Sequence, residues 1–469
     1  MASSTPPTQS KISTFYQAKL GLREQIERGL ALLRTSHIQK EIQEQVLRVE
    51  VLVENVDVLT WLNSQKEHPK IYWRSRDTSF EVAGIGSALT IRKNDFRHIR
   101  EVMERMQSLL DRKERDIRFY GGFSFNDDVI NENRWKPFGQ THFIIPQFEL
   151  VKTAKGVSLA CNFLYNNDYQ NRLQEVYESL SQLVTDITVD GVQHNTYLFR
   201  EDVPTKESWL QTTESAINDI KNGDYDKVVL SRRSTIEMAE SVKPIGFLSR
   251  LRQYSNNTFN FCFQPESGFA FLGASPERLF RIINNKIDTE AIAGTRIRGK
   301  SNAEDDWIGQ ELLKSEKDIL EHKVVMDMIE ESLFPFVEAI QKDDSVSLLK
   351  LTHLQHLNFR FSGELKGDIS FYEILKSFHP TPAIAGYPKH LSLSAIQKYE
   401  AFERGWFSAP IGWISHDSAE FVVAIRSALI YENKISLYAG AGINAGSDPG
   451  KEWQEVEDKI SRYLKLLES

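Results

Sequence analysis

The sequence predicts an α+β fold that forms one large domain. Segments with apolar residues at helical spacing alternate along the whole chain with short strand-like runs bounded by glycine and proline. The chain contains no fixed-period repeat, and no linker rich in proline, glycine and serine divides it. Its 469 residues, of which 41% are hydrophobic, are enough to bury a large core. We therefore predict a mobile polar tail over residues 1–14 and a single domain over residues 15–469.

Two kinds of local pattern define the expected elements. Apolar residues recur every three or four positions in the segments predicted as helices, at about 19–54, 95–112, 171–185, 207–221, 303–332 and 450–467. β-Branched and aromatic residues mark the segments predicted as strands, at about 71–73, 80–84, 118–124, 141–146, 227–233 and 421–429. The last helix has the clearest start, because the segment 447–450 provides an N-cap side chain and a proline in the first turn.

Charge and composition argue against several classes of protein. The net charge of −8 disfavours nucleic acid or an anionic membrane as the main partner. No apolar stretch approaches the roughly 20 residues that cross a bilayer. The two cysteines, Cys161 and Cys262, form no CxxC motif, so a reducing cytoplasm is expected. The segment 1–23 has serine, threonine and basic residues but no acidic residue, which leaves import into a plastid as an alternative.

Lys227 and Glu277 are the first candidates for a chemical role. Lys227 opens the strand-like run 227–233, and Glu277 follows fifty positions later in Ser-Pro-Glu-Arg. Taken singly, the lysine reads as a solvated charge at a strand edge and the glutamate as part of a turn. Together with further carboxylates and an arginine downstream, they predict a general base and a general acid around one anionic substrate.

Two glutamates on predicted helices are candidate metal ligands. Glu321 falls among apolar residues on one face of the helix at 303–332, where Lys317 one turn earlier could neutralise it. Glu455 stands four residues before Lys459, a spacing that also suits an ordinary surface ion pair. Two hard oxygen ligands are too few for a calcium cage but suit Mg²⁺, which retains water and takes further oxygens from its substrate.

Other residues suggest an anion site. Arg426 interrupts the apolar run 421–429, where an inward-facing arginine needs a carboxylate or phosphate partner, although strand alternation could instead turn it to solvent. Gly440 and Gly442 permit close approach of a ligand to the backbone. His356 lies three residues after His353, and with no third ligand nearby both are expected to form hydrogen bonds rather than to bind metal.

The motifs around these residues occur together and in a fixed order. They are found at 226–232, 271–278, 289–296, 317–322, 355–357, 379–383, 404–413, 424–427, 440–443 and 452–455. With this series the chain resembles the chorismate-utilising enzymes, which include isochorismate and salicylate synthases and the large subunits of anthranilate and aminodeoxychorismate synthases. The motifs are strongest in residues 200–469, and weaker similarity extends to about residue 50. The resemblance implies two stacked β-sheets flanked by helices in one domain.

The resemblance also implies a role for each candidate residue. Chorismate is the expected substrate and Mg²⁺ the expected cofactor, held by Glu321 and Glu455. Lys227 would activate water for attack at C2 of chorismate, and Glu277 would protonate the departing C4 hydroxyl. The substrate-binding residues implied are Thr295, His356, Phe407, Arg426, Ser427, Gly440, Gly442 and Lys459.

The expected activity is that of an isochorismate synthase, an isomerase. A salicylate synthase, which also eliminates pyruvate, is the alternative, because it shares the lysine of Lys227. Phe407 departs from the tyrosine of salicylate synthases, and Glu403 stands where aspartate is usual. Ala293 occupies the lysine position of aminodeoxychorismate synthases, so amination and a glutaminase partner are disfavoured. A monomer or homodimer is expected, serving menaquinone, phylloquinone or siderophore synthesis.

Overall fold

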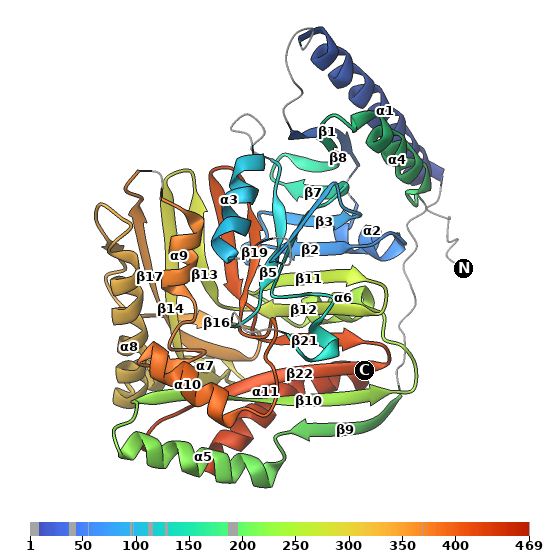
Figure 1. Ribbon diagram of the computed structural model, residues 1–469. Coiled ribbons are helices and arrows are strands. Elements are labelled where there is room, and N and C mark those ends of the chain that lie inside the picture. Colours follow the sequence, from blue (N-terminus) through green and yellow to red (C-terminus); the bar gives the residue numbers. More distant parts are fainter. Residues whose placement is uncertain are drawn as a thin grey trace.

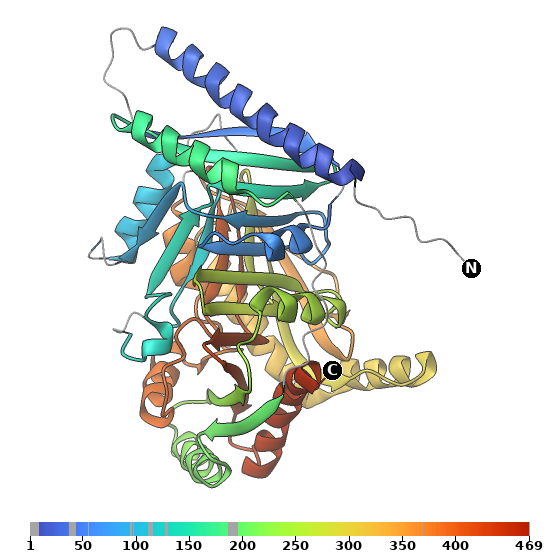
Figure 2. The ribbon, with the colours of Figure 1, turned by 90° about the vertical axis from the view of Figure 1, so that its right-hand side faces the viewer.

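The computed structural model consists of two large antiparallel β-sheets with helices around them (Figures 1 and 2). In Figure 1 the strands of one sheet run across the view, and those of the other run steeply. This crossing is typical of orthogonal sheet packing. The structure describes residues 9–36, 44–54, 56–93, 96, 98–110, 116–126, 130–185, 196–367 and 369–468. The predicted α+β fold with two stacked sheets is confirmed.

The first sheet has twelve strands among the described residues. In spatial order they are β1 (Gln45–Val53), β8 (Gly156–Tyr165), β7 (Phe148–Thr153), β3 (Glu81–Ile85), β2 (Lys70–Arg74), β11 (Phe259–Glu266), β12 (Phe269–Ser275), β21 (Ser427–Tyr431), β22 (Lys434–Ile443), β10 (Lys227–Met238) and β18 (Gly386–Tyr387), with β9 (Tyr197–Val203) also paired to β10.

The second sheet has ten strands within the same described part of the chain. In spatial order they are β15 (Gln341–Lys342), β17 (Leu354–Glu364), β14 (Lys286–Ile297), β13 (Arg278–Ile283), β20 (Ser418–Val423), β19 (Pro410–Ile414), β5 (Phe119–Phe123), β6 (Thr141–Ile145) and β4 (Leu89–Arg92), with β16 (Ser347–Lys350) paired to β17.

Helices cover both sheets. Near the N-terminal end, α1 (Gln9–Ser36) and α4 (Tyr169–Gln182) pack on β1 and β8, and α2 (Val58–Ser64) packs on β3. The remaining helices are α3 (Ile99–Leu109), α5 (Lys206–Lys221), α6 (Pro244–Gln253), α7 (Asn302–Lys314), α8 (Glu316–Leu333), α9 (Phe371–Phe378), α10 (Lys389–Tyr399) and α11 (Pro449–Glu468). Of these, α8 lies against β14, α11 against β22 and α10 against β10, and α8 and α11 contribute residues to the site described below.

The two sheets are joined where neighbouring chain segments pass from one to the other. The chain leaves β12 in the first sheet and continues directly into β13 in the second. It returns from β20 in the second sheet to β21 in the first, and β20 pairs with β13 while β21 pairs with β12. The residues between the strands, 276–277 and 424–426, therefore lie side by side at this crossing.

Aromatic rings fill the space between the sheets. The ring of Trp406 lies 5.4 Å from that of Phe138 and 5.2 Å from that of Phe263, measured between centroids. All three side chains are buried. Aromatic pairs at such separations add to the free energy gained from burying their area. The three rings belong to a buried cluster that contains residues of both sheets.

Two predicted helices differ from the structure. The segment 45–53 falls within the first predicted helix, but it forms β1, because valine recurs at every second position from 49 to 53 and all nine residues pair with β8. The helix predicted at 303–332 is two helices, since the Ser315 side chain accepts a hydrogen bond from the Asp318 backbone N–H and caps α8. Helix α1 begins at Gln9, inside the predicted tail, and residues 1–8 lie outside the described part of the chain.

The buried face of α8 is also not the predicted one. Leu320 is 65% exposed and Val324 is 41% exposed. The helix instead buries the stripe that includes His322, Val325 and Ile329. The apolar spacing therefore identified the helix but not the side that faces the core.

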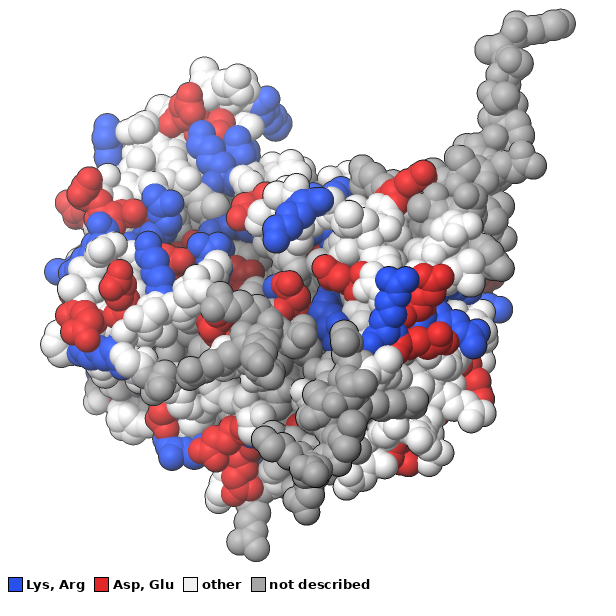
Figure 3. All heavy atoms as spheres, turned by 90° about the horizontal axis from the view of Figure 1, so that it is seen from above, with Lys and Arg blue, Asp and Glu red and all other residues white. Residues whose placement is uncertain are grey.

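The molecular surface carries charges of both signs. On the face shown in Figure 3, basic and acidic side chains are interspersed and form no field of one sign. Among the described residues, no helix combines the length and the apolar character needed to span a bilayer.

Replacing Phe421 by alanine is predicted to destabilise the second sheet. This buried ring lies 5.5 Å from the ring of Phe280 and 6.0 Å from that of Phe123. The free energy of unfolding should fall by about 3–5 kcal/mol, measured by urea denaturation. The matched control Phe334→Ala removes a ring that is 69% exposed and should cost less than about 0.5 kcal/mol. Equal losses would contradict this view of the core.

Candidate active site

One cavity lies where the sheets cross. Every predicted site residue except Ser427 lines it, namely Lys227, Glu277, Thr295, Glu321, His356, Phe407, Arg426, Gly440, Gly442, Glu455 and Lys459. These residues come from strands of both sheets, from two helices and from the turns between them. Residues more than 200 positions apart in the sequence thus surround one small space.

Lys227 enters the cavity from the first residue of β10. Its Nζ lies 2.6 Å from Oε1 of Glu321 on α8, and its side chain is 14% exposed. Gly442 on the adjacent strand β22 makes room for it, because a Cβ there would stand 2.7 Å from Lys227 Cε. The sequence suggested Lys317 as the cation beside Glu321. Lys227 takes this place instead, because the start of β10 faces α8.

Glu277 lies in the crossing itself, between β12 and β13. Its backbone oxygen accepts a hydrogen bond from the Val423 N–H, which holds it against the returning chain. Burial raises the pKa of its carboxyl to about 8, the negative charge of Glu290 adds to the rise, and the Thr381 hydroxyl offsets part of it. Glu277 therefore keeps its proton at neutral pH and can act as an acid.

Glu290 lies close to Glu277 and is paired with Arg76. The Arg76 guanidinium donates two hydrogen bonds of 2.7 Å to its two carboxylate oxygens. Sequence reasoning did not identify Glu290, although it lies in the 289–296 motif. A signal was present in the motif, since Glu290 directly precedes the apolar residues 291–293 and a buried carboxylate must have a partner.

Arg426 occupies the turn between β20 and β21. The predicted continuous strand over 421–429 is therefore wrong, because the run divides between the two sheets. Arg426 has φ of +53°, and its carbonyl accepts hydrogen bonds from the Ala274 N–H at 3.0 Å and from the Tyr463 hydroxyl. Because Arg426 lies in a turn, it is neither the inward-facing nor the solvent-facing strand residue that the sequence suggested. From this turn, Arg426 borders the cavity.

Two carboxylates from different helices line the same cavity. Besides Glu321 on α8, Glu455 on α11 contacts Lys459, with 2.7 Å between Oε1 and Nζ. Burial raises the pKa of Glu455, but the charge and hydrogen bond of Lys459, together with the charges of Arg426 and Lys317, outweigh burial, and the net shift is downward. Lys459 also donates to the Gly440 carbonyl at 2.8 Å. The i, i+4 ion pair considered from the sequence is thus present.

This donor set fits a magnesium ion of the kind that keeps much of its water. Within the described residues, no three side chains of the His, Cys, Asp and Glu types gather as a metal cluster. Two carboxylates bordering one cavity nevertheless suit Mg²⁺, which is commonly bound by one or two carboxylates with water and ligand oxygens. Magnesium at this position remains a proposal, developed below.

The opposite wall is built from hydrogen-bonded and aromatic side chains. The Thr295 hydroxyl lies 3.0 Å from Nδ1 of His356, across adjacent strands β14 and β17. The Phe407 ring stacks on that of Tyr438, with centroids 5.2 Å apart and an interplanar angle of 20°. Tyr438 also lines the cavity and was not predicted, because its place depends on strand pairing that the sequence does not reveal.

Ser427 does not line the cavity. It is 1% exposed, and its hydroxyl donates to the Ala424 carbonyl at 3.0 Å. The side chain thereby closes the turn that carries Arg426. The predicted contact of Ser427 with substrate is replaced by this place within the turn.

The comparisons with known proteins identify the class. The family described as chorismate binding enzyme matches residues 31–468 of this chain. The chain therefore belongs to the chorismate-binding enzyme family, and the expectation of an enzyme is confirmed.

Individual relatives carry more specific names. The chain is 31% identical to isochorismate synthase, chloroplastic, of Catharanthus roseus over 91% of this chain and 81% of that protein. It is 29% identical to isochorismate synthase MenF of Bacillus subtilis (strain 168), over 93% and 96% respectively. The solved structure of MenF, the menaquinone-specific isochorismate synthase from Escherichia coli, superposes with a TM-score of 0.83 at 28% identity, covering 93% of this chain and 98% of that one.

The raised pKa of Glu277 predicts a pH-dependent stability. Its folded value of about 8 lies above the unfolded value of about 4.3, so the folded state binds this proton more tightly. The stabilisation is complete below the unfolded pKa and is lost as the pH rises towards 8. Compared with Glu277→Gln, the wild-type free energy of unfolding should fall by about 1 kcal/mol per pH unit between about pH 5 and 8. Urea denaturation at several pH values measures this, and parallel pH profiles would contradict it.

Proposed function

We propose that the protein is an isochorismate synthase, which converts chorismate to isochorismate. The observation that carries the proposal is the pairing of a protonated acid, Glu277, with an amine, Lys227, in one cavity. The names of the full-length relatives support the same reaction.

The two residues divide the proton transfers between them. Lys227 takes a proton from a water molecule as the water oxygen bonds to C2 of chorismate. The ring double bonds shift, the C4–O bond breaks, and Glu277 delivers its proton to the departing hydroxyl, which leaves as water. The contact between Lys227 and Glu321 must give way before Lys227 can accept a proton. The final protonation states are an ammonium and a carboxylate, which exchange one proton through solvent.

Cationic groups at the cavity wall match the two carboxylates of the substrate. Arg426 is positioned to pair with the enolpyruvyl carboxylate, since its backbone is fixed by the crossing. Gly440 and Gly442 border the same cavity on β22. Phe407 and Tyr438 supply a flat apolar wall for the ring.

Magnesium completes the proposal. Glu321 and Glu455 would hold it, and when bound the ion supplies positive charge for the ring carboxylate of chorismate. Glu321 and Glu455 each contact a lysine. Binding of the ion would replace that lysine as the cationic partner of each carboxylate.

Lys227→Gln and Glu277→Gln are each predicted to reduce turnover by about 10²- to 10⁴-fold, because each removes one proton-transfer group. Purified protein is incubated with chorismate and Mg²⁺, with and without ammonium. The products are separated by chromatography and identified by mass spectrometry. The exposed residues Lys323 and Glu331 provide matched controls as Lys323→Gln and Glu331→Gln, which should retain activity.

The products of the unmodified protein decide the class. Isochorismate alone supports the proposal. Salicylate with pyruvate, an aminated product, or no reaction would each contradict it.

Glu455→Gln is predicted to weaken magnesium binding, because an amide oxygen carries no net charge to attract the ion. The Mg²⁺ concentration for half-maximal activity should rise about tenfold or more, which corresponds to about 1.4 kcal/mol. Isothermal titration of Mg²⁺ into the protein with chorismate present provides the second measurement. Glu331→Gln is the control on α8, and unchanged Mg²⁺ dependence in Glu455→Gln would remove this residue from the metal site.

A further inference from the structure

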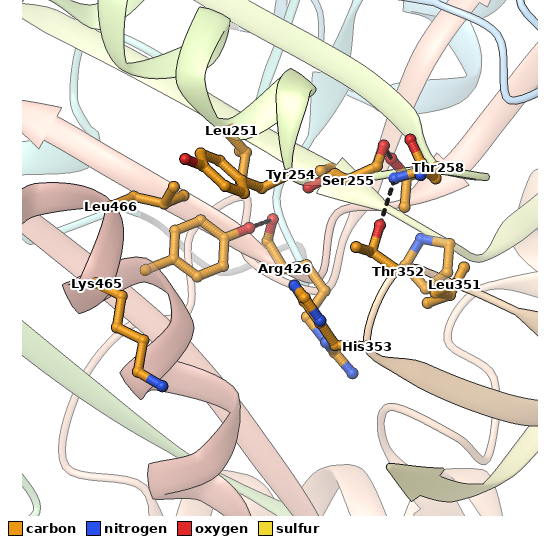
Figure 4. Close-up of a pocket in the computed structure, with 14 residues that line it drawn as sticks. Leu251, Tyr254, Ser255, Thr258, Leu351, Thr352, His353, Arg426, Lys465 and Leu466 are labelled. Carbon is orange, nitrogen blue, oxygen red and sulfur yellow. Dashed lines mark hydrogen bonds between the residues drawn. The ribbon is translucent and has the colours of Figure 1, made fainter. Parts of the chain in front are cut away.

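A second pocket lies on the far side of Arg426 from the cavity described above. It has a volume of about 540 Å³, within the range of small-molecule sites. The two spaces share Arg426 and Pro276, whereas Lys227, Glu277 and the two candidate metal ligands border only the first. Figure 4 shows the Arg426 side chain reaching into this second pocket beside His353.

Three segments that are distant in the sequence build its walls. The chain after α6 is tied to the loop before β17, because the Asn256 N–H donates to the Thr352 hydroxyl at 2.8 Å and the Asn257 side chain donates to the Lys350 carbonyl at 2.8 Å. The end of α11 forms the third wall, and its Tyr463 hydroxyl donates to the Arg426 carbonyl. The pocket is thus a defined feature of the fold and not a gap between loose loops.

The lining of this pocket combines apolar side chains with nitrogen donors. Leu251, Leu351 and Leu466 are buried and give it apolar walls, and the ring of Tyr254 at its rim is 53% exposed. Arg426, His353 and Lys465 supply nitrogen donors. Among the described residues that line it, none is an aspartate or glutamate. Such a surface suits a flat apolar ligand with a single negative charge.

We propose that this pocket binds a small aromatic carboxylate, separately from the substrate. The ring packs between Tyr254 and the leucines, and the carboxylate pairs with Arg426 and His353. Because Arg426 borders both spaces, the ligand competes with substrate for its guanidinium without entering the substrate cavity. Binding therefore raises KM for the substrate and leaves kcat unchanged.

The first test measures occupancy without relying on catalysis. Both native cysteines are buried, so Asn256→Cys places an accessible thiol at the pocket wall. Benzoate is the probe, and benzyl alcohol is its uncharged counterpart. The labelling rate of the new thiol by a thiol reagent should fall about tenfold when benzoate stands at about ten times its Kd, because only the empty pocket reacts.

Three controls test whether the protection is specific to this pocket and to the carboxylate. Leu52→Cys, at a position 77% exposed on the distant strand β1, should label at the same rate with and without benzoate. Benzyl alcohol should protect the thiol at position 256 much less than benzoate does. Adding His353→Ala and Lys465→Ala to Asn256→Cys should raise the Kd of benzoate about tenfold or more, since both donors border only this pocket.

The second test examines the link through Arg426 and rests on the proposed function. Benzoate should raise KM for chorismate in the unmodified protein, and His353→Ala with Lys465→Ala should remove that effect while keeping the basal activity. The proposal is overturned by unprotected labelling, by equal protection from benzyl alcohol, or by benzoate inhibition that persists in the double variant. A protein that is protected by benzoate but makes no isochorismate would refute the proposed function and leave the pocket's ligand class standing.

Discussion

The paired crossing of two chain segments between the sheets is the constraint on which the site depends. The Ser275 hydroxyl donates to the Val423 carbonyl at 2.6 Å, the Val423 N–H donates to Glu277, and the Ala274 N–H donates to Arg426. Each segment thus supplies donors and acceptors to the other, and neither can move alone without leaving buried polar groups unsatisfied. The backbones of the acid and the arginine are held beside each other by two backbone hydrogen bonds and by the bond from the Ser275 side chain.

The same crossing explains the electrostatics. A carboxyl placed between two sheets loses contact with water, which favours its protonated form, and the anionic Glu290 favours that form further. The glutamates at the cavity edge have the opposite environment, because each contacts a lysine. One cavity therefore holds a neutral acid at its buried end and two lysine-paired carboxylates nearer the surface. Glutamates of one cavity can therefore serve two different functions, proton donation and cation binding.

Sequence patterns and the family resemblance predicted the fold class, and all but one of the predicted site residues line the cavity. They did not predict the contacts between these residues. Lys227 was recognisable from its motif, whereas its pairing with Glu321 depends on how α8 packs against β14. The continuous apolar run at 421–429 concealed the change of sheet, because both sheets bury both faces of their strands there and alternation gives no signal. The 45–53 segment was misassigned because its spacing of apolar residues is compatible with either period, and pairing with β8 decided the outcome.

The source of the new hydroxyl oxygen tests the central claim most directly. If Lys227 activates water while Glu277 expels the C4 hydroxyl, a reaction in H₂¹⁸O must place solvent oxygen at C2 of the product. Mass spectrometry of isochorismate formed in one turnover should therefore show one ¹⁸O atom, located at C2 by fragmentation. Isochorismate without ¹⁸O would show that the original hydroxyl migrates within the substrate, and would contradict the assignment of acid and base made here.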